Sequence, residues 1–267
     1  MNSKTGQKTN NIVKITVSVT GLVLILAGCG AEAESAAEGS SANGGVLPVD
    51  APLRAPTWAE DEGEGVVIAL RETGQQLVRL EESGSFDGTR EIPVTLSAEL
   101  DGVAGENIAL EEGRLPDGVY IPKPERDEVA VIENDDLLEV RALPGGESPV
   151  RVALGGTTTA GNTATLFSLS RDGSKVTAVG FDDFEVLTEL VVGASEDALI
   201  EASGEDGFWL AGPEGVALYE VNFPGLKAEL SVNAGALAVD AADLGRAYVA
   251  ELSSGRVMLV EPGGEGE

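Results

Sequence analysis

The chain contains no histidine and a single cysteine among its 267 residues. Without histidine, Ser-His-Asp and Cys-His catalysis, imidazole general bases and nearly all zinc, copper and non-haem iron sites are excluded. One cysteine cannot form an intramolecular disulfide. Any chemistry would therefore rest on carboxylates, Lys, Arg, Tyr or a hard cation such as calcium.

Basic residues are also scarce, with 17 Lys and Arg against 46 Asp and Glu, which gives a formal net charge of -29. Such a surface repels phosphate, so a nucleic acid is not expected as a partner. It also repels anionic lipid headgroups, so the folded body should not lie flat on a membrane. We interpret the acidic excess as a source of solubility, with salt adaptation and cation capture as the alternatives.

Long segments free of glycine and proline are missing from most of the chain, which has 35 Gly and 12 Pro. After the N-terminal segment, the longest such stretch is residues 125–143. Helical bundles and long coiled coils need longer uninterrupted helices and are therefore excluded. Short segments between frequent turns favour an all-β fold.

The N-terminus carries a targeting pattern. Three lysines precede an apolar run at residues 15–27, which ends in a Leu-Ala-Gly tripeptide followed by Cys29. The run is too short for a comfortable transmembrane helix and suits the core of a signal peptide. The pattern resembles the bacterial lipoprotein signal peptide with its lipobox. The resemblance implies that residues 1–28 are removed and that Cys29 carries the lipid; an ordinary cleaved signal with a chance cysteine is the alternative.

Residues 29–45 comprise this cysteine and a stretch rich in Ala, Glu, Ser and Gly. It has too little apolar content to fold, so we expect a flexible linker before a folded domain at residues 46–267. The lipoprotein resemblance implies a lipid anchor on the extracytoplasmic face of a bacterial cell membrane. Which membrane is meant, if there are two, is left open.

Five successive segments share an internal repeat. A large apolar residue marks the first strand of each, at Ile68, Tyr120, Phe167, Phe208 and Tyr248. A second apolar residue follows eight or nine positions later, at Leu77, Val129, Val176, Val216 and Val257. The first set recurs at intervals of 52, 47, 41 and 40 residues. A period of this size suits a four-stranded β-propeller blade.

Further apolar segments supply the other strands of each repeat. Outer strands are expected at residues 92–96, 138–141, 186–190 and 228–232, and innermost strands at 108–110, 150–154, 198–200 and 236–239. The fifth repeat stops after its third strand, and we predict that residues 46–53 provide the missing outer strand and close the ring. The expected fold is an all-β propeller of about five four-stranded blades, with another β-sandwich or barrel as the alternative.

One repeat carries the pattern most clearly. Residues 116–120, with the sequence Pro-Asp-Gly-Val-Tyr, lead to the strand at 129–132 and the acidic residue Glu133. This pattern resembles the YVTN-type β-propeller repeats of bacterial surface and secreted proteins. The resemblance is good over residues 105–261 and poor over residues 58–104. That family has Asp where Glu133 stands here.

The loops offer few candidates for chemistry. We interpret the acidic groups as solvated turns, since none has the spacing of a calcium loop: Asp135-Asp136, Asp182-Asp183, Glu205-Asp206 and residues 60–62. Arg151 lies in an expected innermost strand, where it either pairs with a neighbouring blade or holds an anionic ligand. Phe208 and Trp209 are expected to pack between blades rather than stack on a ligand.

These features favour a non-catalytic, lipid-anchored propeller of the bacterial envelope that binds or scaffolds an envelope protein or a glycan. The only site residue assigned is the lipidated Cys29, through which the protein would meet the membrane, and no catalytic residue, metal ligand or cofactor is predicted. A calcium-dependent lactonase-like or glycan-acting enzyme, with carboxylates at the mouth of the channel, is the alternative. A folded spacer without a ligand is a third possibility.

Overall fold

The computed structural model describes nine ranges of the chain, which are residues 52–61, 64–81, 94–111, 118–133, 136–155, 165–204, 207–221, 225–240 and 243–262. The chain divides into two units, Met1–Gly44 and Gly45–Glu267. All the described residues lie in the second unit. The residues predicted above as signal peptide (1–28) and as lipidated cysteine and linker (29–45) lie outside the described ranges, and so do residues 46–51.

Within the described ranges, nineteen strands form five small antiparallel sheets. The first two sheets contain β1 (Leu53–Asp61), β2 (Glu64–Arg71), β3 (Gln76–Glu81) and β4 (Val94–Glu99), then β5 (Ala109–Glu111), β6 (Gly118–Lys123), β7 (Glu128–Ile132) and β8 (Glu139–Pro144). The third contains β9 (Pro149–Gly155), β10 (Thr165–Ser170), β11 (Lys175–Gly180) and β12 (Val186–Val191). The fourth contains β13 (Leu199–Ala202), β14 (Gly207–Gly212), β15 (Gly215–Glu220) and β16 (Gly225–Leu230), and the fifth β17 (Ala234–Asp240), β18 (Asp243–Glu251) and β19 (Val257–Val260).

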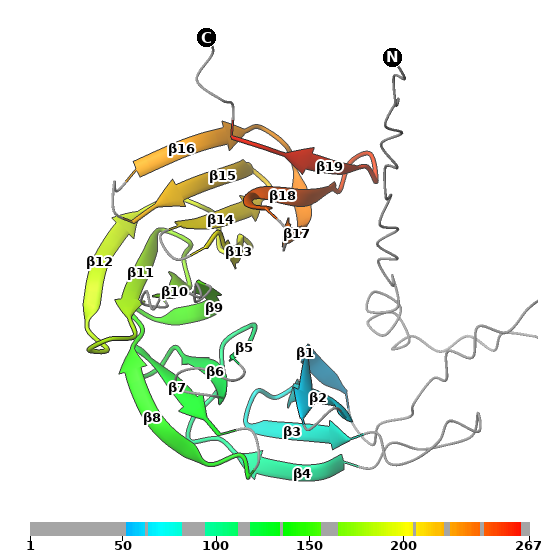
Figure 1. The fold of residues 1–267 in the computed structure, drawn as a ribbon, viewed down its shortest axis with the longest axis vertical. Helices are drawn as coiled ribbons and strands as arrows, with labels where there is room; N and C mark the ends of the chain where they lie inside the picture. Colours follow the sequence, from blue (N-terminus) through cyan, green and yellow to red (C-terminus); the bar gives the residue numbers. More distant parts are fainter. Residues whose placement is uncertain are drawn as a thin grey trace, which may run out of the picture. The chain divides into compact units, whose positions relative to one another are not determined.

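The five sheets are the blades of a β-propeller, numbered here in chain order. Within each blade the strands pair in sequence order, and the first strand lies innermost while the last lies at the outside (Figure 1). The chain passes from the outer strand of one blade to the innermost strand of the next. No helix long and apolar enough to cross a bilayer occurs in the described ranges.

Apolar cores lie between successive blades. Residues of blades 1 and 2 share one cluster, those of blades 2 and 3 a second, blades 3 and 4 a third, and blades 4 and 5 a fourth. Successive side chains of a strand point to opposite faces of its sheet, so blades 2, 3 and 4 each contribute to the cores on both of their sides. The blades therefore pack side by side around the molecule. The alternative expectation, a sandwich of two facing sheets, is wrong.

The repeat read from the sequence places most strands correctly. The strand expected at residues 257–260 coincides with β19, and those expected at 92–96 and 228–232 overlap β4 and β16 with shifts of a few residues. Strand β1 was not predicted. Its sequence contains Pro56 and an acidic end, and its register shifts between Arg54 and Thr57, so it lacks a regular apolar alternation.

The predicted closing strand differs from the structure at its C-terminal end. Leu53 begins β1, the innermost strand of blade 1, where it pairs with Arg71. It therefore does not belong to an outer strand of blade 5. The rest of that predicted strand, residues 46–51, lies outside the described ranges, and among the described residues blade 5 has three strands.

The position equivalent to Tyr120 and Phe167 in blade 4 is Trp209, not the predicted Phe208. Trp209 packs toward the following blade, as Tyr120 and Phe167 do, whereas Phe208 packs toward the preceding one. The cause is a shorter turn. Only two residues separate β14 from β15, whereas four separate β10 from β11. Phe208 and Trp209 both pack between blades, as expected, and each is fully buried.

Candidate functional site

The innermost strands are where a propeller presents side chains to its axis, and their two ends define two rims. Neighbouring innermost strands pack on one another around the axis, β1 on β5, β5 on β9, β9 on β13 and β13 on β17. Because each blade repeats the same path, their amino ends gather at one rim and their carboxyl ends at the other. We call these the amino-end rim and the carboxyl-end rim.

At the amino-end rim, Arg151 of β9 joins three blades. Its guanidinium forms an ion pair with Glu106, in the loop that leads into blade 2. It also donates to the carbonyl oxygens of Glu196, at 3.0 Å, and Ala198, in the loop that leads into blade 4. The side chain is only 12% exposed. Arg151 is thus engaged between blades, which agrees with the first of the two interpretations of this residue.

Arg54 of β1 makes the equivalent contact between blades 1 and 2. It donates to the carbonyl oxygens of Gly105 at 2.6 Å and Ala104 at 3.1 Å. Burial lowers the pKa of Arg54, and the nearby Glu106 carboxylate opposes this shift. Its Nε is buried without a partner. The two arginines near the axis at this rim therefore hold the blade connections together.

An asparagine side chain makes a further contact between blades, in which it bonds the backbone of β9 as a neighbouring strand would. The Asn107 amide donates to the carbonyl oxygen of Val152 and accepts from the Val152 amide, both at 2.8 Å. Lys123, at the end of β6, is 1% exposed and donates to the carbonyl oxygen of Asp101 at 3.0 Å. Burial lowers the pKa of Lys123. Asn107 thus satisfies the backbone of strand β9, and Lys123 satisfies the backbone of the loop that leads into blade 2.

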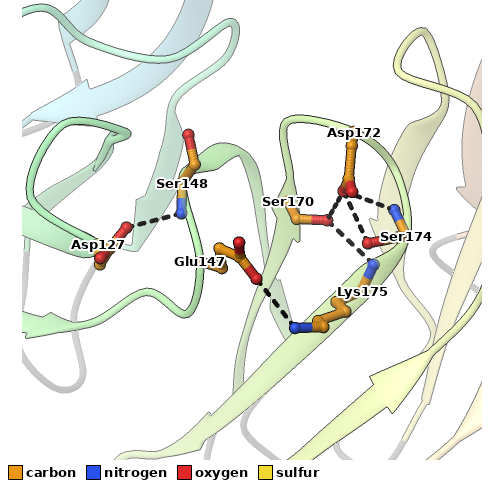
Figure 2. A network of polar contacts seen from close by, with 7 residues as sticks. All are labelled: Asp127, Glu147, Ser148, Ser170, Asp172, Ser174 and Lys175. Carbon is orange, nitrogen blue, oxygen red and sulfur yellow. Dashed lines mark hydrogen bonds and ion pairs between the residues drawn. The ribbon is translucent and has the colours of Figure 1, made fainter.

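Figure 2 shows a polar network at this rim that joins blades 2 and 3. One Asp172 carboxylate oxygen accepts from the Ser170 hydroxyl at 2.7 Å and from the Ser174 hydroxyl at 2.8 Å. It also accepts from the Ser174 amide at 3.0 Å. These hydrogen bonds lower the pKa of Asp172 to about 2. The carboxylate thus fixes the turn between β10 and β11.

Two contacts in Figure 2 hold the loop between β8 and β9, one to the start of β11 and one to the turn between β6 and β7. Lys175 forms an ion pair with Glu147 at 2.9 Å. In the same loop, the Ser148 amide donates to Asp127 at 2.8 Å. Backbone bonds add to these, from the Arg171 amide to the Ser148 carbonyl and from the Gly145 amide to the Asp127 carbonyl, both at 2.9 Å. The network is therefore structural, with its polar groups satisfied by one another.

A shallow pocket of about 90 Å³ lies between the loop before β13 and the β14–β15 hairpin. Tyr219 in its wall donates to the Val192 carbonyl at 3.3 Å, and burial together with the Glu229 carboxylate raises the pKa of this tyrosine. The pocket also contains Glu214 and Ser195, whose hydroxyl is buried without a partner. Its size suits water or a small polar group.

The carboxyl-end rim collects acidic residues. β1, β5 and β17 end at Asp61, Glu111 and Asp240, and Glu201 is the penultimate residue of β13. Of these four, only Glu201 has a described side chain. It is accessible to solvent, but protein atoms surround its carboxyl group closely enough that desolvation raises its pKa to about 7.

Glu201 lies opposite Trp209 in the register of β13 and β14. The Trp209 side chain is fully buried, and its Nε1 has no hydrogen-bond partner. Residues that sit directly opposite in an antiparallel pair have side chains on the same face of the sheet. Sequence reasoning did not select Glu201, because a lone glutamate in a strand carries no motif; its pairing with a buried residue is a tertiary feature.

Asp136, Asp182 and Asp183 lie in turns, as expected, whereas residues 60 and 61, which were also expected in a turn, belong to strand β1. Asp183 accepts from the Glu185 amide at 3.0 Å, and Asp136 accepts from the Leu138 amide at 3.4 Å. Residues 134–135 and 205–206, and residue 62, lie outside the described ranges, as does Cys29. Among the described residues, no group of three or more His, Cys, Asp or Glu side chains is placed to hold a metal ion.

Comparisons with known proteins show the fold. No family model and no curated protein matches the chain. Dihydro-heme d1 dehydrogenase NirN in complex with DHE superposes with a TM-score of 0.52 and 11% identity, over 74% of this chain and 42% of that one. This chain therefore spans about two fifths of the NirN chain.

Two structures of BBS1N in complex with ARL6DN are similar as well. The one soaked with mercury has a TM-score of 0.55 and 12% identity, over 80% of this chain and 68% of that one. The one soaked with lead has a TM-score of 0.53 and 11% identity, over 82% and 81%. At these identities the likeness shows a β-propeller fold.

Proposed function

We propose that this chain is a lipid-anchored protein of the bacterial cell envelope whose β-propeller binds or scaffolds an envelope protein or a glycan without catalysing a reaction. The anchor rests on the sequence alone, on the lysine-led apolar run and the tripeptide before Cys29. Two or three acyl chains, at about 0.8 kcal/mol per buried methylene, make such attachment stable. No nucleic acid is proposed as a partner, because the net charge of -29 repels phosphate.

The observation that carries the binding role is the apolar character of the outer strands. In β12, Val186, Leu187 and Val191 are 45%, 53% and 82% exposed. In the neighbouring blade, Leu138 and Val140 at the outer strand are 58% and 52% exposed. Exposed apolar side chains on two outer strands favour contact with a macromolecule. Near the axis, by contrast, Arg54 and Arg151 already serve contacts between blades.

The enzymatic alternative is favoured by a different observation, the acidic ends of the innermost strands at the carboxyl-end rim. The fold is compatible with both roles, since one similar structure is a dehydrogenase and two are complexes with ARL6DN. Calcium titration by calorimetry separates them. Binding that is lost in Glu201→Gln would support a carboxylate site at this rim and count against the scaffold.

Anchoring is tested by fractionating cells that express the wild type or Cys29→Ala. We expect the wild type to sediment with membranes and to show an acylated Cys29 by mass spectrometry, and the variant to lose the acyl group and the stable attachment. Ala27→Val, which keeps Cys29 but disturbs the small residues before it, serves as a control for processing. An unmodified thiol on the purified native protein would remove the anchor.

Binding is tested by chemical cross-linking in intact envelopes. We expect one defined partner to cross-link to the wild type and to disappear when Leu187→Glu and Val191→Glu are introduced together in β12. Glu189→Gln, in the same exposed strand, is the matched control and should leave the cross-link unchanged. Equal capture by all three proteins would contradict a role for this surface.

A further inference from the structure

The outer strand of each four-stranded blade has an edge that faces away from the sheet. Strands β4, β8, β12 and β16 each pair with the third strand of their own blade and, among the described strands, with no other. Such an edge leaves a row of backbone donors and acceptors with which another strand can pair. Folded proteins commonly block it with proline, with lysine or other charged side chains, or by keeping the strand polar.

Three of these four edges carry blocking residues. β8 contains Arg141 and ends at Pro144. β16 contains Lys227, which forms an ion pair with Glu220 at 2.8 Å. β4 has a polar residue at every second position. β12, by contrast, has the sequence Val-Leu-Thr-Glu-Leu-Val, without proline or a basic residue, and is therefore the edge least protected against pairing.

The backbone of β12 directs two of its amides outward. The ladder with β11 is regular from Thr188 to Val191, and it continues with a hydrogen bond from the Val192 amide to the Ser174 carbonyl at 2.9 Å. Residues opposite each other in an antiparallel pair alternate between those that bond across the ladder and those that do not. Counting back from Val192, the amides and carbonyls of Val191 and Glu189 point away from β11.

Charge around this strand favours an incoming strand with basic ends. Three exposed carboxylates lie in the turn before β12, at residues 182–185. The basic side chains nearby are engaged, since Lys175 pairs with Glu147 at 2.9 Å and Arg141 lies over the Phe184 ring at 4.0 Å. A basic segment therefore meets complementary charge, whereas a second copy of this chain, with its net charge of -29, is repelled.

We propose that β12 accepts an extended segment of a partner protein, apolar at alternate positions and basic at its ends, as a fifth strand of blade 3. The backbone of that segment bonds Glu189 and Val191, and its apolar side chains pack beside the exposed Leu187 and Val191. In strand addition of this kind, the backbone bonds supply affinity and the side chains supply specificity. The proposal rests on the proposed binding role of the outer strands and makes the partner a protein.

The pairing is tested with a synthetic peptide, Lys-Val-Thr-Val-Thr-Val-Lys, acetylated and amidated at its ends. Its sequence reads the same in both directions, so it fits a parallel or an antiparallel strand. A saturating amount should slow the hydrogen exchange of the Glu189 and Val191 amides at least about fivefold, and leave the amides of β8 and β16 unchanged. The matched control is the same peptide N-methylated at its three valines, which keeps charge and side chains but cannot bond as a strand.

A backbone substitution in the protein gives an independent readout. Val191→Pro removes one outward amide at a position where an edge strand tolerates proline, and it should abolish the protection of Glu189 by the peptide. Val191→Ile keeps the amide and an apolar side chain and should retain that protection. Should Val191→Pro fail to fold, the comparison of the two peptides on the wild type still decides.

No protection by the unmodified peptide, or equal protection by both peptides, overturns the proposal. Protection that rises with protein concentration in the absence of peptide would instead pair two copies through β12, and overturns it as well. If the peptide protects nothing while the envelope cross-link is still lost on joint substitution of Leu187→Glu and Val191→Glu, strand addition fails and the proposed binding role stands. If the peptide protects but the cross-link survives those substitutions, strand addition stands and the proposed role of this surface in the envelope fails.

Discussion

Replacing Arg151 with methionine tests whether this residue holds the blades together. Methionine keeps the apolar stem but removes the guanidinium, so the carbonyl oxygens of Glu196 and Ala198 lose their charged donor. Hydrogen bonds to charged groups contribute about 1.5–3 kcal/mol each. The pair with Glu106 adds little, at about 1 kcal/mol or less, because Glu106 is 49% exposed. We expect Arg151→Met to destabilise the fold by about 2–4 kcal/mol.

The assay is thermal and urea unfolding followed by circular dichroism. For a domain of this size, the expected loss lowers the Tm by about 5–12 °C. Arg171→Met is the matched control, since its ion pair with Glu125 spans 3.9 Å and both side chains are more than half exposed; it should cost less than about 1 kcal/mol. If the two variants unfold alike, or if Arg151→Met changes ligand binding without changing stability, the interblade interpretation is wrong.

Two further predictions follow from the carboxyl-end rim and from the interblade loops. Because the pKa of Glu201 is raised to about 7 from 4.5, the folded state loses stability as pH rises between these values. Glu201→Gln should therefore gain stability over the wild type across that window and keep a constant advantage above it; an advantage independent of pH, in urea titrations from pH 4 to 8, would contradict this. Gly146→Ala should destabilise more than Gly193→Ala, because both glycines have positive φ but only at Gly146 would a Cβ meet Thr177 Oγ1, at 2.0 Å. Equal Tm losses would show that backbone strain alone decides the effect.

The repeat was visible in the sequence because the second and third strands of blades 2 and 3 are buried on both faces. Their apolar residues form compact runs such as residues 119–121 and 129–132, separated by a turn of fixed length. Where the turn length changes, the predicted position of the anchor residue is wrong by one. In blade 4, Phe208 was predicted, but Trp209 is the equivalent residue. A one-residue slip exchanges the two faces of a strand, so only the packed structure shows which aromatic ring points toward which blade.

One innermost strand, β1, was not located. The other four, expected at residues 108–110, 150–154, 198–200 and 236–239, overlap β5, β9, β13 and β17. β1 contains Pro56 and a register shift, and its Ala55 has a φ of 49°. Its role as the first strand of blade 1 depends on pairing with β2, which local sequence does not reveal. Glu201 and its neighbour Trp209 likewise meet only through pairing between strands.

Composition and repeat spacing by themselves determined that this chain has no histidine chemistry, that its surface is strongly acidic, and that its body is built from successive four-stranded units. These properties are local or additive along the chain. The tertiary structure alone decided the role of Arg151, which contacts loops about 45 residues away on either side. A charged side chain becomes a ligand site or a structural contact according to the groups that folding brings beside it, and those groups are distant in sequence.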